Sequence, residues 1–185
     1  MRKVVKFGAF FNRAGIFRRA LVDTSGAVML EFAFVVVPLV TLIVAVLQVA
    51  LIFFASQLLD TATQASARTI MTGNTQTAAM SQADFKAAAC ARLPTFMECS
   101  KLTVDVVKSS SFASASTGAP TVTYNGSGDA VFPNRYIPGG PNDIVMVRFM
   151  YPWGVIGAPN GLNLATLSNG KFLMMATTVM RTEPY

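Results

Sequence analysis

The sequence predicts an α+β fold in which a long N-terminal membrane-spanning helix continues into a small antiparallel β-sheet domain. The first observation is an apolar run from Phe32 to Leu59 that contains no charged side chain. The second is a change, later in the chain, from helical spacing of apolar residues to alternation with a period of two. The third is a set of Gly-, Asn- and Pro-rich segments short enough to join antiparallel neighbours.

The apolar run is too long for a secretory signal. An α-helix needs roughly 20 apolar residues to cross a bilayer. A signal-peptide core has about 7–15 and ends in a small-residue cleavage site. The nearest such pattern, Ala65-Ser66-Ala67, lies too far downstream. We therefore predict a transmembrane helix that the protein retains.

The predicted helix covers residues 27–72. Residues 24–26, Thr-Ser-Gly, offer N-cap chemistry for a helix that starts near Ala27. Pro38 frees one backbone carbonyl and predicts a kink. The charge-free run gives way to an amphipathic pattern, and Gly73-Asn74 is the first stop signal. The first half of the helix is expected to lie in lipid. The second half is expected to form a stalk that enters the exported domain.

The basic residues are concentrated before the helix. The net charge is +6, and residues 1–26 hold six Lys or Arg against one Asp, whereas residues 27–185 hold nine basic and eight acidic residues. This asymmetry favours a cytoplasmic N-terminus and an exported C-terminal domain over nucleic-acid binding. The basic leader is either an amphipathic segment lying on anionic lipid or an unstructured tail that sets orientation.

Residues 73–185 are expected to form the exported α+β domain. Ser81 is a candidate cap for a short helix that ends near Arg92, before Leu93-Pro94. Residues 157–170 suggest one short helix or an irregular loop. The predicted strands are 102–107, a hairpin of 121–124 with 130–132, 144–151 stopped by Pro152, and 172–181. We expect the sheet to lie against the stalk half of the long helix.

The composition argues against an enzyme. The chain has no histidine, so the commonest general base and the commonest transition-metal ligand are missing. Neither a Gly-rich phosphate loop nor a Ser-centred nucleophile elbow occurs. We therefore expect no catalytic residues, no cofactor and no metal. An exported enzyme anchored to the membrane is the class with least support.

Two groups of residues in the exported domain have alternative interpretations. Cys90 and Cys99 are the only cysteines, and export favours an intrachain disulfide over free or metal-bound thiols. Asp129, Asn142 and Asp143 lie in loops that could converge on a calcium ion, but they form no EF-hand pattern. The ordinary interpretation of these three is as solvated or capping side chains.

Glu31 is an acid at the head of the apolar run, and it allows two interpretations. Near a helix start, the macrodipole favours a carboxylate and water can still reach it. Alternatively, cleavage of the Gly26-Ala27 bond would place a new ammonium group on Ala27. Glu31 of a neighbouring subunit would then neutralise that ammonium when helices pack together, because unpaired charges in a low dielectric are several kcal/mol unfavourable.

Residues 26–68 resemble the TadE-like family, the minor pseudopilins of tight-adherence (Tad/Flp) pilus systems within the type IV pilin-like class. The family's processing site is a glycine, four further residues and then Glu-Phe, and Gly26, Glu31 and Phe32 match it. The end of the sequence, Arg181 to Tyr185, resembles the family's basic-x-Glu-Pro ending. The resemblance implies a pilin-like fold and cleavage after Gly26 by a prepilin peptidase.

The resemblance implies a minor pseudopilin that helps to initiate or cap a Tad-type pilus. The implied partners are the prepilin peptidase, other pseudopilins, the major pilin, the assembly platform of the inner membrane, and lipid. The alternative is a single-pass membrane-anchored interaction module of the bacterial envelope that is never processed. In that case Gly26 is only a helix cap and Glu31 only a partner of the helix dipole.

Overall fold

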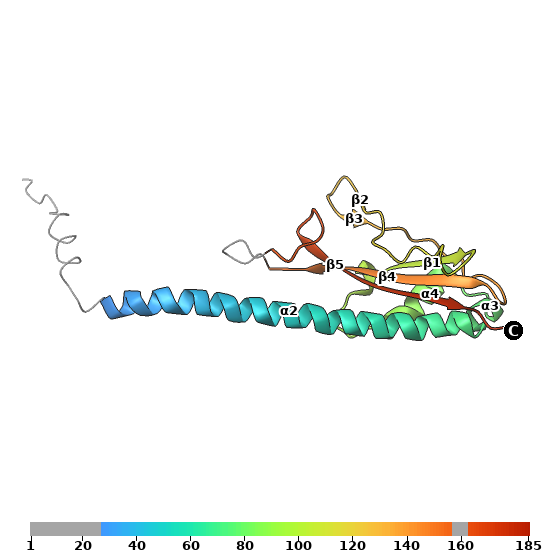
Figure 1. Ribbon diagram of the computed structural model, residues 1–185, viewed down its shortest axis with the longest axis horizontal. Coiled ribbons are helices and arrows are strands. Elements are labelled where there is room, and N and C mark those ends of the chain that lie inside the picture. Colours follow the sequence, from blue (N-terminus) through green and yellow to red (C-terminus); the bar gives the residue numbers. More distant parts are fainter. Residues whose placement is uncertain (1–26, 157–162) are drawn as a thin grey trace, which may run out of the picture. The chain divides into compact units, whose positions relative to one another are not determined.

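A computed structural model of the chain describes residues 27–156 and 163–185 (Figure 1). The predicted leader, residues 1–26, and part of the predicted 157–170 segment lie outside these residues. The boundary between two compact units falls within the long helix, after Val44. The elements are α2 (Ala27–Met71), α3 (Asn74–Thr77), α4 (Gln82–Cys90), the 3-10 turn η2 (Cys99–Lys101), β1 (Thr103–Ser109), β2 (Thr123–Tyr124), β3 (Ala130–Val131), β4 (Ile144–Gly154) and β5 (Lys171–Arg181).

Helix α2 is a single helix of 45 residues, so the long helix predicted from the charge-free run is confirmed. It continues through Pro38, whose ring removes one backbone donor from the helix interior. The hydroxyl of Thr41 donates to the carbonyl of Val37, 2.8 Å away. This bond occupies a carbonyl one residue before the proline.

The C-terminal end of α2 is held by the last residues of the sequence. Gly73 ends the helix in the left-handed conformation, with φ of 75°, as its predicted stop role requires. The ring of Tyr185 lies against the Cα of Gly73. The backbone N–H of Glu183 donates to the carbonyl of Met71 at 2.9 Å. The end of the chain thus covers backbone groups that the helix terminus would otherwise leave unpaired.

The domain contains a three-stranded antiparallel sheet in the order β1-β4-β5. Strand β4 is central: its first seven residues pair with β1, and all eleven pair with β5. The predicted hairpin is also present, as the separate two-stranded sheet β2-β3. The predicted α+β arrangement with a small antiparallel sheet is therefore confirmed. In the short α4, the predicted cap Ser81 forms a capping box with Asp84.

The prediction that Pro152 stops its strand is wrong, because β4 continues to Gly154. Pairing with β1 ends at Met150, so at Pro152 only β5 lies alongside. Pro152 is opposite Leu173, whose N–H points away from β4 and donates to the Thr166 hydroxyl at 2.8 Å. The pair is therefore a non-hydrogen-bonded one, and the nitrogen that lacks a proton faces an unpaired edge, where proline is tolerated.

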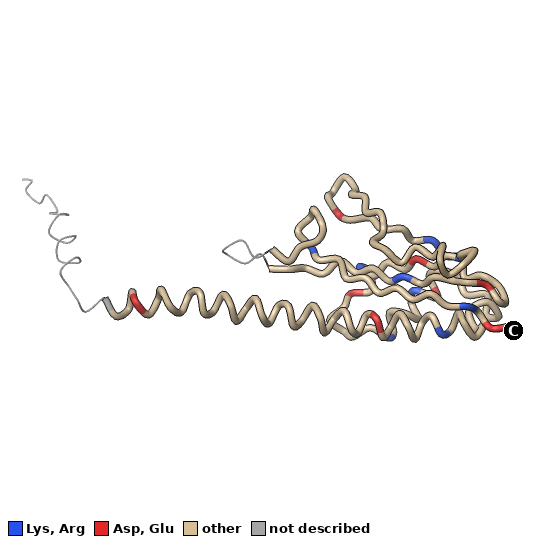
Figure 2. The backbone as a smooth tube through the Cα atoms, viewed as in Figure 1, with Lys and Arg blue, Asp and Glu red and all other residues tan. Residues whose placement is uncertain are grey.

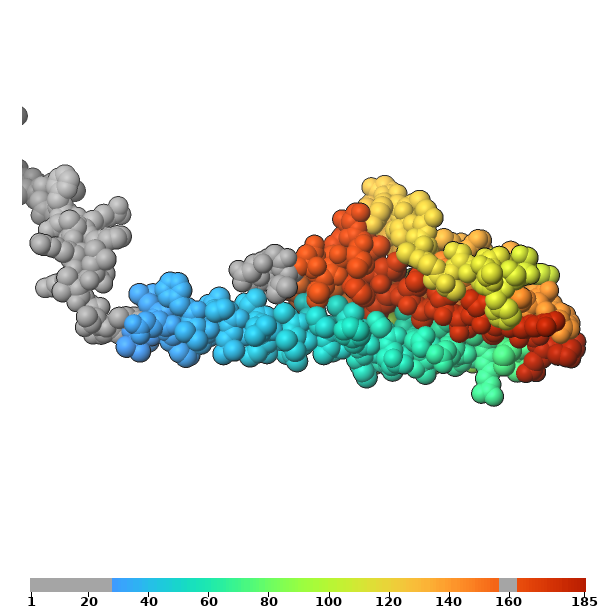
Figure 3. All heavy atoms as spheres, viewed as in Figure 1, coloured from blue at the N-terminus to red at the C-terminus, as the bar shows by residue number. Residues whose placement is uncertain are grey.

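The main core lies between one face of the three-stranded sheet and the helices α2 and α4. Alternate residues of the central strand, from Val145 to Tyr151, point into it. Helix α2 contributes Ala55, Leu59, Ala67 and Ile70, and Figure 3 shows domain atoms lying against this part of the helix. The expected packing of the sheet on the stalk half of the helix is confirmed.

The opposite face of the sheet carries a buried charge cluster. Asp105 is fully buried and accepts hydrogen bonds from Nε and Nη2 of Arg135, at 2.9 and 2.8 Å. Arg148, directly opposite Asp105 on β4, is also buried and donates to the carbonyl of Ser116. These contacts attach the loops before β2 and after β3 to the sheet.

Replacing Gly73 with alanine is expected to destabilise the domain by about 2 kcal/mol or more, because a Cβ in the left-handed region is strained and would overlap the Tyr185 ring. Urea unfolding of the full chain in detergent, followed by fluorescence, measures the loss. Gly126→Ala is the matched control, since Gly126 has open space at its Cβ position and no positive φ. Equal midpoints for the two variants would contradict the role of Gly73.

Candidate membrane and assembly segment

The N-terminal part of α2 exposes apolar side chains on all its faces. A patch of this extent is foreign to a soluble monomer surface, and a helix apolar all round belongs in lipid or against other apolar helices. The exposed large apolar residues here are Val28, Met29, Leu30, Phe32, Phe34, Val35, Val37, Leu39, Val40, Leu42, Ile43, Val44, Val46, Leu47, Val49, Leu51, Phe53 and Phe54.

The length of this surface matches a bilayer. Ile52 is 6% exposed and is the first residue of α2 that the domain buries, followed by Ala55 and Leu59. From the start of the charge-free run to Leu51 there are twenty residues, or about 30 Å of helix, which equals the usual hydrocarbon thickness. The helix is therefore long and apolar enough to span a membrane. Figure 2 shows this part of α2 without blue or red segments.

The residues of the predicted processing site stand at the start of α2. Ala27 is the first helical residue, whereas Gly26 lies outside the described part of the chain. Glu31 is exposed and is the fifth residue of the helix, beyond the first turn, where the influence of the helix terminus falls off. Within residues 27–156 and 163–185, none of the ion pairs includes Glu31. Phe32, next to it, is 67% exposed.

Comparison with known families identifies this helix. Residues 26–68 match the family model described as TadE-like protein. The match defines a TadE-like domain at residues 26–68, which is less than half of the chain. The match confirms the resemblance found in the sequence. No curated protein and no solved structure matches the chain.

The TadE-like domain coincides almost entirely with α2. It begins one residue before the helix and ends three residues before Met71. It therefore contains Gly26, Glu31, Phe32 and Pro38, but none of the β-sheet. The match thus covers the exposed apolar surface and most of the buried stripe that packs on the domain, and it ends at residue 68.

Outside the TadE-like domain, the predicted disulfide is confirmed. Cys90 and Cys99 are bonded, with their Cα atoms 5.5 Å apart. The bond joins the end of α4 to the start of η2. Closing this short loop contributes roughly 2–3 kcal/mol on a chain-entropy argument. Both cysteines of the sequence are consumed, so neither is a free thiol.

A calcium ion shared by Asp129, Asn142 and Asp143 is excluded by their positions. Asp129 pairs with Lys171, opposite the last residue of β4. Asp143 immediately precedes β4 and pairs with Lys108 at 2.8 Å. The two carboxylates therefore lie at opposite ends of an eleven-residue strand, whereas calcium ligands all lie within about 2.6 Å of the ion. Both acids serve as salt-bridge partners instead.

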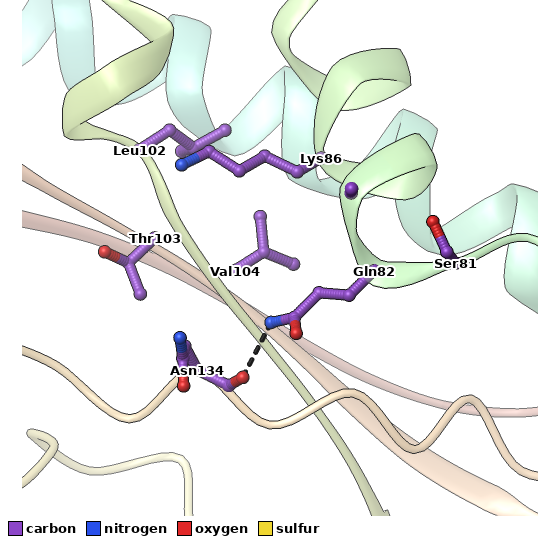
Figure 4. Close-up of a pocket in the computed structure, with 8 residues that line it drawn as sticks. Ser81, Gln82, Lys86, Leu102, Thr103, Val104 and Asn134 are labelled. Carbon is purple, nitrogen blue, oxygen red and sulfur yellow. Dashed lines mark hydrogen bonds between the residues drawn. The ribbon is translucent and has the colours of Figure 1, made fainter.

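Sequence reasoning did not find the hollow between α4 and β1, which measures about 440 Å³ (Figure 4). The amide of Gln82 reaches across it and donates to the carbonyl of Asn134 at 2.6 Å. Lys86 is the one titratable side chain in its lining. A lone lysine among neutral groups forms neither an acid–base pair nor a metal site, so the hollow gives no support to catalysis.

The Asp143 carboxylate connects the loop before β4 to Lys108 of β1. The Lys108 ammonium, and then the Gly140 N–H, lower the pKa of the Asp143 carboxyl below its ordinary value. The hydroxyl of Thr182 accepts the N–H of Asp143 at 2.9 Å and donates to the carbonyl of Gly140 at 2.6 Å. The carboxylate also accepts the N–H of Gly140 at 2.7 Å, so it holds the loop to which Thr182 donates.

We expect Asp143→Asn to reduce the loss of stability that the domain shows as the pH becomes acidic. Because the pKa of Asp143 is lower in the folded state, its carboxylate stabilises the folded domain at pH values above the ordinary Asp pKa, about 3.9. This stabilisation is lost as the pH falls through the folded-state pKa. Urea midpoints of wild type and variant between about pH 2 and 7 measure this. Asp129→Asn is the control, because its ion pair is longer and more exposed. A constant gap between wild type and Asp143→Asn at every pH would contradict the assignment.

Proposed function

We propose that the chain is a minor pseudopilin that takes part in the initiation or tip of a Tad/Flp-type pilus, and that a prepilin peptidase cleaves it after Gly26. The TadE-like match begins at Gly26 and α2 begins at Ala27. Cleavage at this bond would remove the basic leader and leave the helix whole. The mature protein would comprise Ala27–Tyr185 and start directly with the apolar segment.

The observation that carries the proposal is the all-round apolar exposure of the first half of α2. In the inner membrane these side chains contact lipid, with the N-terminus cytoplasmic and the domain exported. In a filament the same side chains pack against helices of other pseudopilins and the major pilin. Lipid and neighbouring helices are similar apolar environments, so exchange between them needs little hydrophobic free energy and is decided by packing and polar pairs.

Glu31 is the polar group that would set the register of this packing. After cleavage, the ammonium of Ala27 lies four residues before Glu31, or about 6 Å along the axis. A neighbouring subunit staggered by that distance presents its Glu31 beside the ammonium of the first. Breaking such a pair in a low dielectric costs about 3–5 kcal/mol, so mispositioned subunits are disfavoured.

The cleavage is tested by mass spectrometry of the chain purified from cells with and without the prepilin peptidase. We expect a chain that begins at Ala27 when the peptidase is present and at Met1 when it is absent. Gly26→Ile should block processing, whereas Gly15→Ile, a second glycine of the leader, should not. A chain that keeps Met1 beside an active peptidase would overturn the proposal in favour of an unprocessed membrane-anchored interaction module.

The charge pair is tested with Glu31→Gln, which keeps shape and removes the charge. We expect normal processing and membrane insertion, but at least a roughly tenfold loss of co-purified partner subunits. Asp60→Asn is the matched control, since Asp60 lies on the same helix and accepts only a hydrogen bond from Gln64. Undiminished assembly by Glu31→Gln would leave Glu31 without a role in pairing.

A further inference from the structure

We propose that the exported domain also touches the bilayer itself, through an apolar collar formed by Phe54, Phe96, Trp153 and Ile156. The inference rests on the proposal that α2 spans a membrane, and it adds a second contact of the protein with lipid. The partner is the outward-facing surface of that same bilayer, at the boundary between headgroups and acyl chains.

Three separate segments build the collar. Phe54 of α2 is 57% exposed, and its ring stacks on Phe96 with centroids 6.4 Å apart. Phe96, from the loop before η2, is 51% exposed and meets Trp153 of β4 edge-on at 6.2 Å. Trp153 also packs on Tyr151, whose buried hydroxyl accepts the N–H of Glu98 at 3.0 Å. The rings are therefore held in place by the folded domain.

The position of the collar fits the membrane interface. Phe54 follows Leu51, the end of the bilayer-length segment, by three residues or about 4.5 Å along the helix. Tryptophan and other aromatic residues concentrate at this depth, where one edge of the ring is wet and the rest is apolar. Ile156, two residues beyond the end of β4, is 72% exposed and bonds through its backbone to Gln48 of the same helix. The collar is thus continuous with the side chains that contact the acyl chains.

Gln48 gives the second, independent observation. It is one of two polar side chains between Phe32 and Leu51, and the other, Thr41, bonds to its own helix. With its amide oriented to pair both polar atoms, Oε1 of Gln48 accepts the N–H of Ile156 at 2.9 Å and Nε2 donates to its carbonyl at 3.2 Å. In water neither backbone group would need this partner.

In hydrocarbon, by contrast, every backbone donor and acceptor needs an internal partner. Gln48 precedes the end of the bilayer-length segment by about 4.5 Å, so Ile156 is held at the depth of the span and not above it. The double hydrogen bond satisfies the backbone of Ile156 while leaving its side chain exposed. This arrangement fits a chain segment that enters lipid.

The single tryptophan of the sequence, Trp153, makes the test direct. The full chain is reconstituted in phosphatidylethanolamine–phosphatidylglycerol vesicles that contain phosphatidylcholine brominated at shallow or deep acyl carbons. We expect shallow bromines to reduce the Trp153 emission roughly twofold and deep bromines to act less, as for a ring at the interface. Aqueous iodide should quench less than it quenches the same chain unfolded in urea.

Flotation of the vesicles separates this inference from the proposed function. A chain that floats, but whose Trp153 responds to iodide and not to brominated lipid, overturns the collar alone. Loss of the chain from the floated vesicles overturns the membrane span and the collar together. Trp153 could also be shielded from both iodide and brominated lipid, and lose that shielding when the chain is diluted in lipid. That result would identify a second copy of the chain as the partner that covers the collar, and it would overturn the lipid contact.

Variants of the contact supply the control. Phe96→Ser and Gln48→Leu should lower quenching by brominated lipid at least roughly twofold while flotation is unchanged, because they remove an aromatic of the collar and the tie to Ile156. Phe112→Ser is the matched control, since Phe112 is 57% exposed, against 51% for Phe96, but lies in the loop after β1. Equal quenching in all three variants would overturn the inference.

Discussion

The structure depends on one helix whose two halves suit different environments. Up to Leu51, α2 is apolar on every face, which suits lipid or the core of a filament. Beyond Phe54 only one stripe is apolar, and the domain buries it. No break separates the two parts, because α2 is one helix from Ala27 to Met71. The sheet and residues 181–185, the closing segment, hold that stripe in place.

The closing segment connects the sheet to the end of α2. Thr182, buried at 2% exposure, links the loop before β4 to the end of β5, and Glu183 bonds to the last turn of α2. The basic-x-Glu-Pro ending noticed in the sequence therefore has a local structural role: it joins the sheet to the terminus of the helix. A motif that resembles a family feature can be explained here by hydrogen bonding alone.

Much of the fold was predictable because it follows from local patterns. The charge-free run, the stop at Gly73, the cap at Ser81 and the two-residue alternation of the strands each depend on neighbouring residues. The effect of Pro152 on its strand could not be predicted, because a strand tolerates proline only where its nitrogen faces no neighbouring strand. Where β1 ends is set by the tertiary structure. The same limit applies to Asp129 and Asp143: both lie in loops, but only the register of β4 shows that they are at opposite ends of the sheet.

The collar could not be found from the sequence for a related reason. Phe54, Phe96 and Trp153 are far apart in the chain, and no local sequence pattern connects them. Gln48 carried the one local signal, because an amide inside an apolar run needs a partner. That partner is a backbone segment more than a hundred residues away. Gln48 ties the domain to the helix at the depth of the span. Withdrawal of α2 from lipid into a filament must then also withdraw the collar. Release from the membrane and assembly would therefore be coupled through the Gln48 side chain.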